Sequence, residues 1–326
     1  MPLIPMRKFL LVLLWTIASY LPVVAQGIGP RSYLLSPTGV TGLNAKWLGM
    51  QGNLIPSGTI LIPGADIEAD IFPLTLFHTF SLGGRFAQIY GMAAPGSSTI
   101  RARVGPPVGP IPTNSITARG FADGFVSFKL GLFGAPALNL VEFAGAPMQF
   151  SLFGEFRVWY SGSYSSAEVF NLGSNRTTLE FGTPMAIPLN KNRAKATWLE
   201  VAPVLQFYTP NQEPARTSGA NKVTQHPMFI LENHLSHNFT KKFWGVANLR
   251  FQFGGETSAD GLDDANAIQA MGGGLGFGYQ ILAPLGISVD YGGVLASNQL
   301  KGQMLRFSLV FAYANLAKAK AQSNKP

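Results

Sequence analysis

Cysteine is absent from the 326-residue chain, which excludes a disulfide framework, thiolate chemistry and a lipoprotein anchor. Charged side chains are also scarce, at 12% of residues compared with about 25% in ordinary soluble domains. So few charges could not coat a soluble surface of ordinary composition. The missing charge therefore argues against a conventional soluble protein.

Apolar residues are abundant at 47%, and the chain has 37 glycines and 12% aromatic residues. This composition is typical of a transmembrane β-barrel, although a glycine-rich secreted β protein would also fit it. The net charge of +8 is spread along the chain without a basic cluster, so we expect no nucleic-acid partner.

The amino terminus has the three parts of a signal peptide. Arg7 and Lys8 precede an apolar stretch at residues 9–20, and Ala25 ends a small-residue cleavage site. We predict a signal peptide over residues 1–25 and export of the protein; an uncleaved anchor is the alternative. Residues 26–39 are expected to form a periplasmic segment and a candidate plug.

Alternation of apolar and polar side chains is the strongest structural signal. In residues 121–132, Phe128 and Leu130 flank Lys129, and the same period of two recurs in residues 148–160. Successive side chains of a strand point to opposite faces, so each segment has one apolar and one charged face. A stretch without charges at residues 265–289 is long enough to span a bilayer, but its glycines also recur at period two, which favours a strand over a helix.

The same criterion predicts strands of bilayer-spanning length along the chain. They cover residues 40–51, 65–77, 83–92, 121–132, 148–160, 175–187, 197–208, 225–239, 242–253, 267–282, 285–295 and 303–314. We predict an all-β fold: a transmembrane antiparallel up-and-down β-barrel of about 12 strands (10–14) over residues 40–314, followed by a tail at residues 315–326.

Long and short connections largely alternate, as in outer-membrane barrels with long external loops and tight periplasmic turns. An even number of strands places both termini in the periplasm. Residues 133–147 are too long for a tight turn and are expected to hold a short periplasmic helix. The stretch from Met92 to Gly120 either folds over the barrel mouth or is disordered.

The charged faces of these strands are expected to line the lumen, because an outward Arg or Lys near the bilayer midplane costs about 2–4 kcal/mol. A soluble sandwich, with the charges in water, is the alternative. The predicted lumen-lining or pore-lining site consists of Asp123, Lys129, Glu155, Arg157, Arg176, Glu180, Glu200, Glu232 and Arg250. Six further charges share this predicted inward phase: Asp66, Glu68, Asp70, Arg85, Asp290 and Arg306. These charges either shape passage through a pore or close a narrow interior with structural ion pairs.

No motif indicates catalysis, a cofactor or a metal ion. His234 and Glu232 share a strand face but His237 points to the other, so three ligands do not converge. The acidic loop at residues 256–264 lacks the EF-hand spacing, which favours a solvated loop. We therefore predict no catalytic residues, no cofactor, no metal and no enzymatic activity.

Several short motifs occur in a fixed order along the chain: LFGAPAL at 132–138, NLGSNR at 171–176, WLE at 198–200, QHP at 225–227 and GGET at 254–257. Together they resemble the bacterial outer-membrane family named for the MetA pathway of phenol degradation. The resemblance covers roughly residues 116–313 and implies an outer-membrane barrel presumed to be a transporter or channel, associated in some members with degradation of aromatic compounds. The segment at residues 161–165 and the lysine-bearing tail depart from the family pattern.

We therefore predict a channel or transporter-like barrel for passive passage of small molecules, with aromatic or apolar solutes favoured by Phe121, Phe125 and Trp198 if these line the lumen. Its expected partners are outer-membrane lipid, a small-molecule solute and the barrel-assembly machinery. A closed structural or adhesion barrel and a barrel-embedded hydrolase are the alternative functions.

Overall fold

The computed structural model describes residues 29–56, 60, 62, 64–103 and 113–314. The predicted signal peptide at residues 1–25 and the tail at residues 315–326 lie outside the described residues. Among the residues described, no helix is both long enough and apolar enough to span a membrane.

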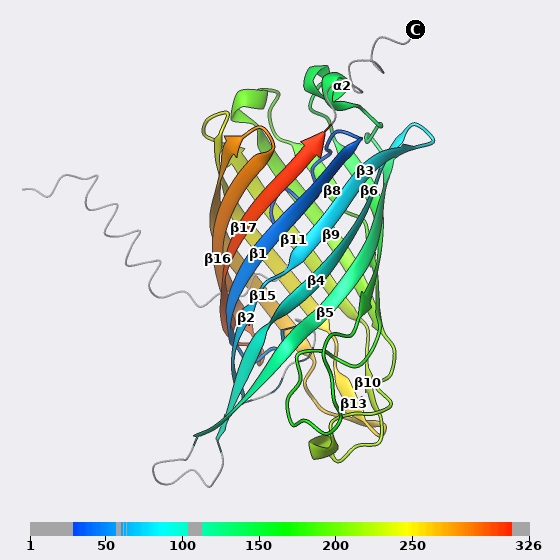
Figure 1. Ribbon diagram of the computed structural model, residues 1–326, viewed down its shortest axis with the longest axis vertical. Coiled ribbons are helices and arrows are strands. Elements are labelled where there is room, and N and C mark those ends of the chain that lie inside the picture. The colour runs from blue at the N-terminus through cyan, green and yellow to red at the C-terminus, as the bar shows by residue number, and fades with distance from the viewer. Residues whose placement is uncertain (1–28, 57–59, 61, 63, 104–112, 315–326) are drawn as a thin grey trace, which may run out of the picture.

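The described chain forms a closed antiparallel barrel whose wall is crossed twelve times (Figure 1). Two crossings are each made of two short strands, β2 with β3 and β7 with β8. The barrel is closed by pairing of β1 with β17 and of β9 with β11. The wall strands are β1 (Val40–Gly52), β2 (Asp66–Ile71), β3 (Leu74–Leu82), β4 (Arg85–Arg103), β5 (Thr113–Phe133), β6 (Ser151–Tyr160), β7 (Thr178–Gly182), β8 (Met185–Pro188), β9 (Thr197–Tyr208), β11 (Met228–Asn238), β12 (Phe243–Gly254), β15 (Ile268–Leu282), β16 (Leu285–Ser297) and β17 (Gly302–Ala314). The predicted all-β barrel of twelve crossings is confirmed.

Proline causes both interruptions, because it has no N–H to donate to a neighbouring strand. Pro73 separates β2 from β3, and Pro184 separates β7 from β8. The carbonyls of these prolines still accept hydrogen bonds across the wall, Pro73 from Lys46 N–H at 2.9 Å and Pro184 from Phe153 N–H at 2.9 Å. The barrel therefore stays closed at both interruptions.

The two ends of the barrel differ. At the turn end, drawn at the top of Figure 1, the connections are mostly short, β1 begins and β17 ends. The longer connection there contains the helix α2 (Leu140–Gly145), which confirms the helix predicted in residues 133–147. The Asn139 side chain accepts from the N–H of Glu142, and the Glu142 side chain accepts from the N–H of Asn139, which completes a capping box.

At the loop end, drawn at the bottom of Figure 1, the connections are mostly longer, and a small sheet of β10 (Val223–Gln225), β13 (Thr257–Ala259) and β14 (Leu262–Asp263) joins two of them. The Asp260 carboxylate accepts hydrogen bonds from the N–H groups of Asn221 and Lys222 across these loops. The stretch from Met92 to Gly120 differs from the expected loop: β4 and β5 continue as a paired hairpin to Arg103 and from Thr113. Residues 104–112 between them lie outside the described part of the chain.

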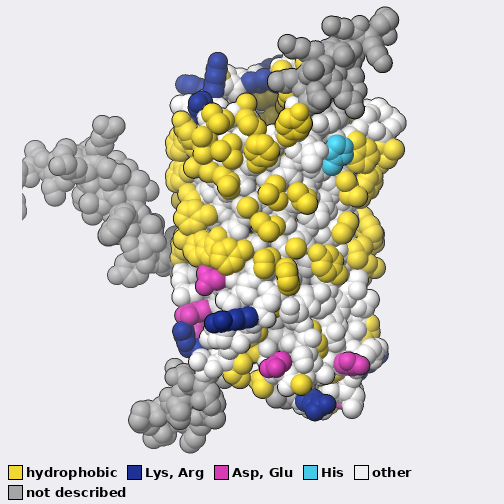
Figure 2. Space-filling view, in the orientation of Figure 1, with side chains coloured by type: hydrophobic (Ala, Val, Ile, Leu, Met, Phe, Trp, Pro, Cys, Tyr) yellow, Lys and Arg dark blue, Asp and Glu magenta, His cyan; other side chains and the backbone are white. Residues whose placement is uncertain are grey.

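Exposed apolar side chains form a belt on the outward faces of the wall strands, and Figure 2 shows this belt on the face turned toward the viewer. Leu76 and Leu275 are each 63% exposed, and the belt continues through aromatic residues such as Phe181 and Phe307. An exposed apolar band of this kind is what a barrel in hydrocarbon requires. The opposite faces of the same strands carry polar and charged groups, which lie inside the barrel.

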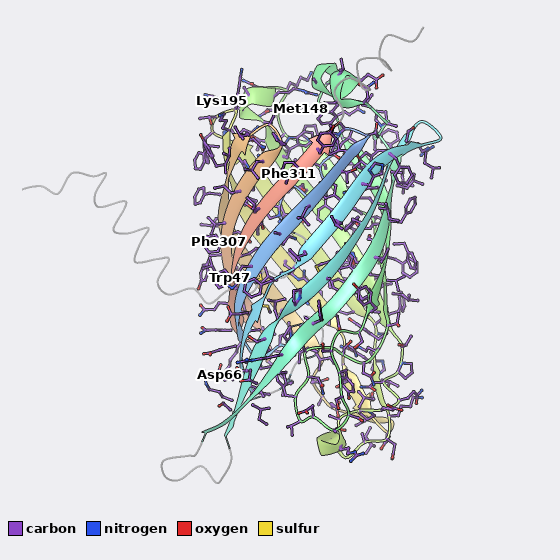
Figure 3. The ribbon with its side chains drawn as sticks, in the orientation of Figure 1. Trp47, Asp66, Met148, Lys195, Phe307 and Phe311 are labelled. Carbon is purple, nitrogen blue, oxygen red and sulfur yellow. The ribbon has the colours of Figure 1, made fainter. Side chains whose placement is uncertain are left out.

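Near the loop end the two faces exchange polarity, which corrects part of the charge prediction. Asp66, Glu68 and Asp70 face outward, whereas the intervening Ile67 and Ala69 are buried inside. Figure 3 shows Asp66 beyond the level of Trp47 and Phe307, which mark the lower part of the belt.

The interior at this level is apolar because loop residues Phe170 and Leu172 pack into it against the inward face of β2. The outward carboxylates meet no such packing, and two guanidinium bonds of 2.6 and 2.9 Å join Arg101 to Glu68 there. Arg85 is also exposed rather than inward: it lies at a turn and donates to the carbonyl of Leu132 at 2.6 Å.

Candidate functional site in the barrel lumen

Residues 29–39 run from the barrel interior to the turn end, where β1 begins, and two of their backbone N–H groups bind one buried carboxylate. The Glu200 side chain on β9 is fully buried and accepts from the N–H of Arg31 at 2.8 Å and of Tyr33 at 2.9 Å. Tyr33 is only 3% exposed, and its hydroxyl donates to Glu232 on β11 at 2.9 Å. Because hydrogen bonds to charged groups are stronger than neutral ones, Glu200 is the principal polar anchor of this segment.

Side-chain contacts from other strands hold the same segment. The Arg31 guanidinium donates to Asn238 at 2.5 Å and lies 4.3 Å from the centre of a Trp244 ring. The Lys129 ammonium donates to the carbonyl of Ser32 at 3.0 Å. Residues from β5, β9, β11 and β12 thus hold the segment across the lumen.

A second cluster lies on the wall formed by β4 to β7. Arg157 donates to Glu180 at 2.5 Å and also contacts Glu155, which accepts from the hydroxyls of Tyr90 and, at 3.1 Å, Ser127. Glu155, Arg157 and Glu180 are all buried. A buried charge is tolerated when it is paired and hydrogen-bonded, and each of these three groups is.

Aromatic and amide groups extend this cluster toward the loop end. Glu180 also accepts from the Trp159 indole at 3.0 Å and from the Gln206 amide at 2.7 Å. The Arg157 guanidinium lies 4.6 Å from the centre of the Phe125 ring. Both acids therefore have several donors, and the cation has carboxylates and an aromatic face as partners.

Two more ion pairs lie on the remaining wall. Arg250 contacts Glu232 on the neighbouring strand, and Arg306 makes two bonds to Asp290, of 2.9 and 2.7 Å. Cross-strand pairing places each cation directly opposite its carboxylate, since Glu232 aligns with Arg250 and Asp290 with Arg306 in the register.

A cavity lies between the segment 29–39 and the loop end. Its volume is about 140 Å³, which is close to the roughly 150 Å³ of an apolar protein cavity that binds benzene. Apolar and aromatic side chains form much of its wall, and the charged clusters form its polar part. The lining includes Tyr33, Met50, Met92, Ala94, Ala122, Phe125, Arg157, Trp159, Glu180, Ile230, Glu232, Arg250, Met304 and Arg306.

The structure places the side chains of all nine predicted site residues inside the barrel. Three of them, Glu155, Arg157 and Glu180, form one cluster, and Glu232 pairs with Arg250. Glu200 and Lys129 bind the segment 29–39 instead of another wall charge.

Asp123 and Arg176 lie nearer the loop end. The Asp123 carboxylate accepts from the N–H groups of Gly162 at 3.0 Å and Ser174 at 2.9 Å, and so ties down the loop between β6 and β7. The Arg176 guanidinium lies over the Tyr208 ring, 4.5 Å from its centre.

The aromatic residues predicted as candidates to line the lumen differ in their positions. Phe125 lines the cavity, whereas Phe121 is 52% exposed and therefore does not line the lumen. Tyr33, Tyr90 and Gln206 were missed by the sequence reasoning. Gln206 shares the predicted inward phase of Glu200 and could have been found from it. Tyr90 has the parity opposite to Arg85, which was predicted to face inward, so the predicted phase of its strand was reversed. No local pattern places Tyr33 in the lumen.

The histidines do not form a metal centre. His234 binds Asn248 at 2.7 Å and stacks on Tyr33, while His226 lies at the loop end, 3.6 Å from Asp263. No group of three or more His, Cys, Asp or Glu side chains suited to a metal ion occurs within the described ranges.

Comparison with known proteins identifies the family of this chain and a solved structure with the same fold. Residues 58–307 match the family described as "Putative MetA-pathway of phenol degradation". The COG4313 outer membrane channel from Pseudomonas putida F1 has a similar structure, with a TM-score of 0.69 and 16% identity over 88% of this chain and 100% of that one. The transport unit of the autotransporter AIDA-I from Escherichia coli is more distant, with a TM-score of 0.46 and 10% identity over 94% and 97% of the two chains. No curated protein matches the sequence.

Proposed function

Because this chain belongs to the MetA-pathway of phenol degradation family and forms an outer-membrane channel-type barrel, we propose that it passes small aromatic or apolar solutes passively across the outer membrane. The supporting observation is the lumen cavity, whose wall combines Met50, Met92 and Met304 with Phe125 and Trp159. Thioether and aromatic side chains suit flat apolar solutes, since sulfur and ring edges both make favourable contacts with aromatic faces.

The polar part of the cavity supplies orientation. Arg157, Glu180 and Glu232 offer charged donors and acceptors to a solute hydroxyl. A site that joins an apolar wall to a few fixed polar groups is the usual form of a small-molecule site. We therefore expect phenol-like solutes, with one ring and a hydroxyl, to be preferred over sugars of similar mass.

In the proposed orientation the turn end faces the periplasm and the loop end faces the exterior, as in other bacterial barrels with short turns on the periplasmic side. The segment 29–39 then acts as a plug between the cavity and the periplasm, and its displacement completes the passage. Export through a signal peptide at residues 1–25 and insertion by the barrel-assembly machinery belong to the same proposal.

The test measures the initial rate at which radiolabelled phenol enters porin-deficient bacterial cells, whose lipopolysaccharide leaflet slows apolar solutes. Ala94→Trp fills the cavity from β4, and Ile89→Trp, on the outward face of the same strand, is the matched control. We expect the wild type and Ile89→Trp to raise the rate several-fold over cells without the protein, and Ala94→Trp to lose the increase. Heat-modifiable mobility on gels verifies that each variant folds.

The main alternative is a closed structural barrel, which the plug segment and the buried ion pairs favour. It predicts that wild type and both variants, all folded and in the outer membrane, leave phenol entry at the rate of cells without the protein. That result would overturn the channel proposal.

A further inference from the structure

Four lysines gather on two neighbouring connections at the turn end. Lys191 and Lys195 lie between β8 and β9, and Lys241 and Lys242 lie between β11 and β12. The two connections are adjacent because β9 pairs with β11, and the N–H of Asn238 donates to the carbonyl of Ala196 at 2.9 Å. We call these four residues the lysine rim.

The lysine rim carries unneutralised charge. All four side chains are exposed, and none forms an ion pair with any residue in the described ranges. Glu142 is the one acidic residue in the described connections of the turn end, and its carboxylate is engaged in the capping box of α2. Arg193, between the two rim lysines of its connection, donates at 3.0 Å to each of two carbonyls at the end of α2 and is therefore occupied.

The rim lies directly beside the edge of the apolar belt. Phe239 precedes Lys241 and Lys242, and Phe243 follows them; their exposed rings lie 5.4 Å apart, centre to centre. Phe243 in turn stacks on the exposed Phe277 of β15 at 5.9 Å. Aromatic side chains concentrate where a barrel leaves the hydrocarbon, so this row marks the level of the lipid headgroups.

Figure 2 shows Lys and Arg side chains along the top edge immediately above the belt, and Figure 3 places Lys195 at that edge. The loop end differs, since its described loops mix both signs, with Glu168, Glu213 and Glu256 among the acids and Arg216, Lys222 and Lys301 among the bases. Among the described residues, the turn end therefore presents a cluster of cations with a single acidic side chain, Glu142, whereas the loop end mixes both signs.

We propose that the lysine rim binds the anionic headgroups of phospholipids in the leaflet that surrounds the turn end. A phosphodiester at the belt edge would meet several mobile ammonium groups, while its acyl chains would lie along Phe239, Phe243 and Phe277. Each Lys near an anionic membrane surface adds an attraction that falls off within the Debye length. The interaction would fix the depth of the barrel at this end, independently of what the lumen carries.

The experiment reconstitutes the full protein into nanodiscs and compares spin-labelled phosphatidylglycerol with spin-labelled phosphatidylcholine by electron paramagnetic resonance. We expect the protein to restrict the anionic lipid with a preference of at least about fivefold, which corresponds to about 1 kcal/mol, the contribution of one lysine at an anionic surface. Lys191, Lys195, Lys241 and Lys242 are replaced together by Gln. The matched control replaces Arg216, Lys222 and Lys301 by Gln at the loop end.

The proposal requires the preference to disappear in the rim variant, to persist in the control and to fall in 1 M salt, where the Debye length is about 3 Å. Heat-modifiable mobility must show that both variants remain folded. Equal preference in the wild type and the rim variant, or equal loss in rim and control variants, would overturn it. Phenol entry does not enter the measurement, so this result and that of the channel test are separable.

Discussion

Replacing Glu200 by Ala should release the segment 29–39 from the lumen. Glu200 accepts two backbone N–H groups from this segment, and each bond to a charged group contributes about 1.5–3 kcal/mol. Because the substitution also relieves the desolvation of a fully buried carboxylate, the lower limit of about 3 kcal/mol is the appropriate figure. Every 1.4 kcal/mol is tenfold in an equilibrium constant, so the displaced fraction should rise roughly a hundredfold.

The absence of cysteine from the chain permits a clean assay. Ser32→Cys places one thiol in the segment, and its rate of labelling by a small maleimide reports how often the segment leaves the lumen. We expect Glu200→Ala to raise this rate roughly a hundredfold and to lengthen open intervals in planar-bilayer recordings.

The control is Glu68→Ala, which removes a carboxylate that also accepts two hydrogen bonds, but from Arg101 on the outer surface of the wall. It should leave the labelling rate unchanged. If Glu200→Ala labelled within about twofold of the parent, the two backbone bonds would not be what holds the segment, and the energy assigned to them here would be wrong.

Three further perturbations test the charges and the belt. Arg157→Ala leaves two buried carboxylates without their cation and should lower stability by about 3–5 kcal/mol in urea unfolding, whereas Arg119→Ala, on an exposed side chain, should change it little. Leu275→Arg places a cation on the lipid face and should cost about 2–4 kcal/mol on refolding into vesicles, while Leu262→Arg, in the short strand β14 at the loop end, should have no comparable effect. The backbone N–H of Asn221, and then that of Lys222, lowers the pKa of Asp260 below its ordinary 3.8. This loop contact is therefore complete above pH 3.8 and is lost as the pH falls through the lowered pKa. Hydrogen exchange of the two amides should accelerate below that pKa in the wild type, and Asp260→Asn should lose this pH dependence.

Strand prediction succeeded because the period of two is a local property. A strand such as β9 (Thr197–Tyr208) has the same limits in the sequence pattern and in the structure. The prediction of a loop from Met92 to Gly120 was wrong because the extended hairpin of β4 and β5 is not a local property. It depends on pairing between the two strands, such as that of Ser98 with Ala118, which the alternation within one strand does not reveal.

Alternation also leaves open which of its two phases faces inward. The side chains of Glu155 and Arg157 point inside, because the alternate side chains of the same strand belong to the apolar belt that faces lipid. For Asp66 and Asp70 the charged phase lies outside, because loop residues fill the interior with apolar groups at the loop end.

The sequence by itself determined that this chain is a barrel of alternating strands, since charge scarcity and side-chain period act within each segment. Only the tertiary structure decided what occupies the lumen. Tyr33 meets Glu232 across 199 residues of sequence and Glu200 across 167. Contacts over such separations depend on closure of the whole barrel, because only the closed wall brings β9 and β11 around the amino-terminal segment.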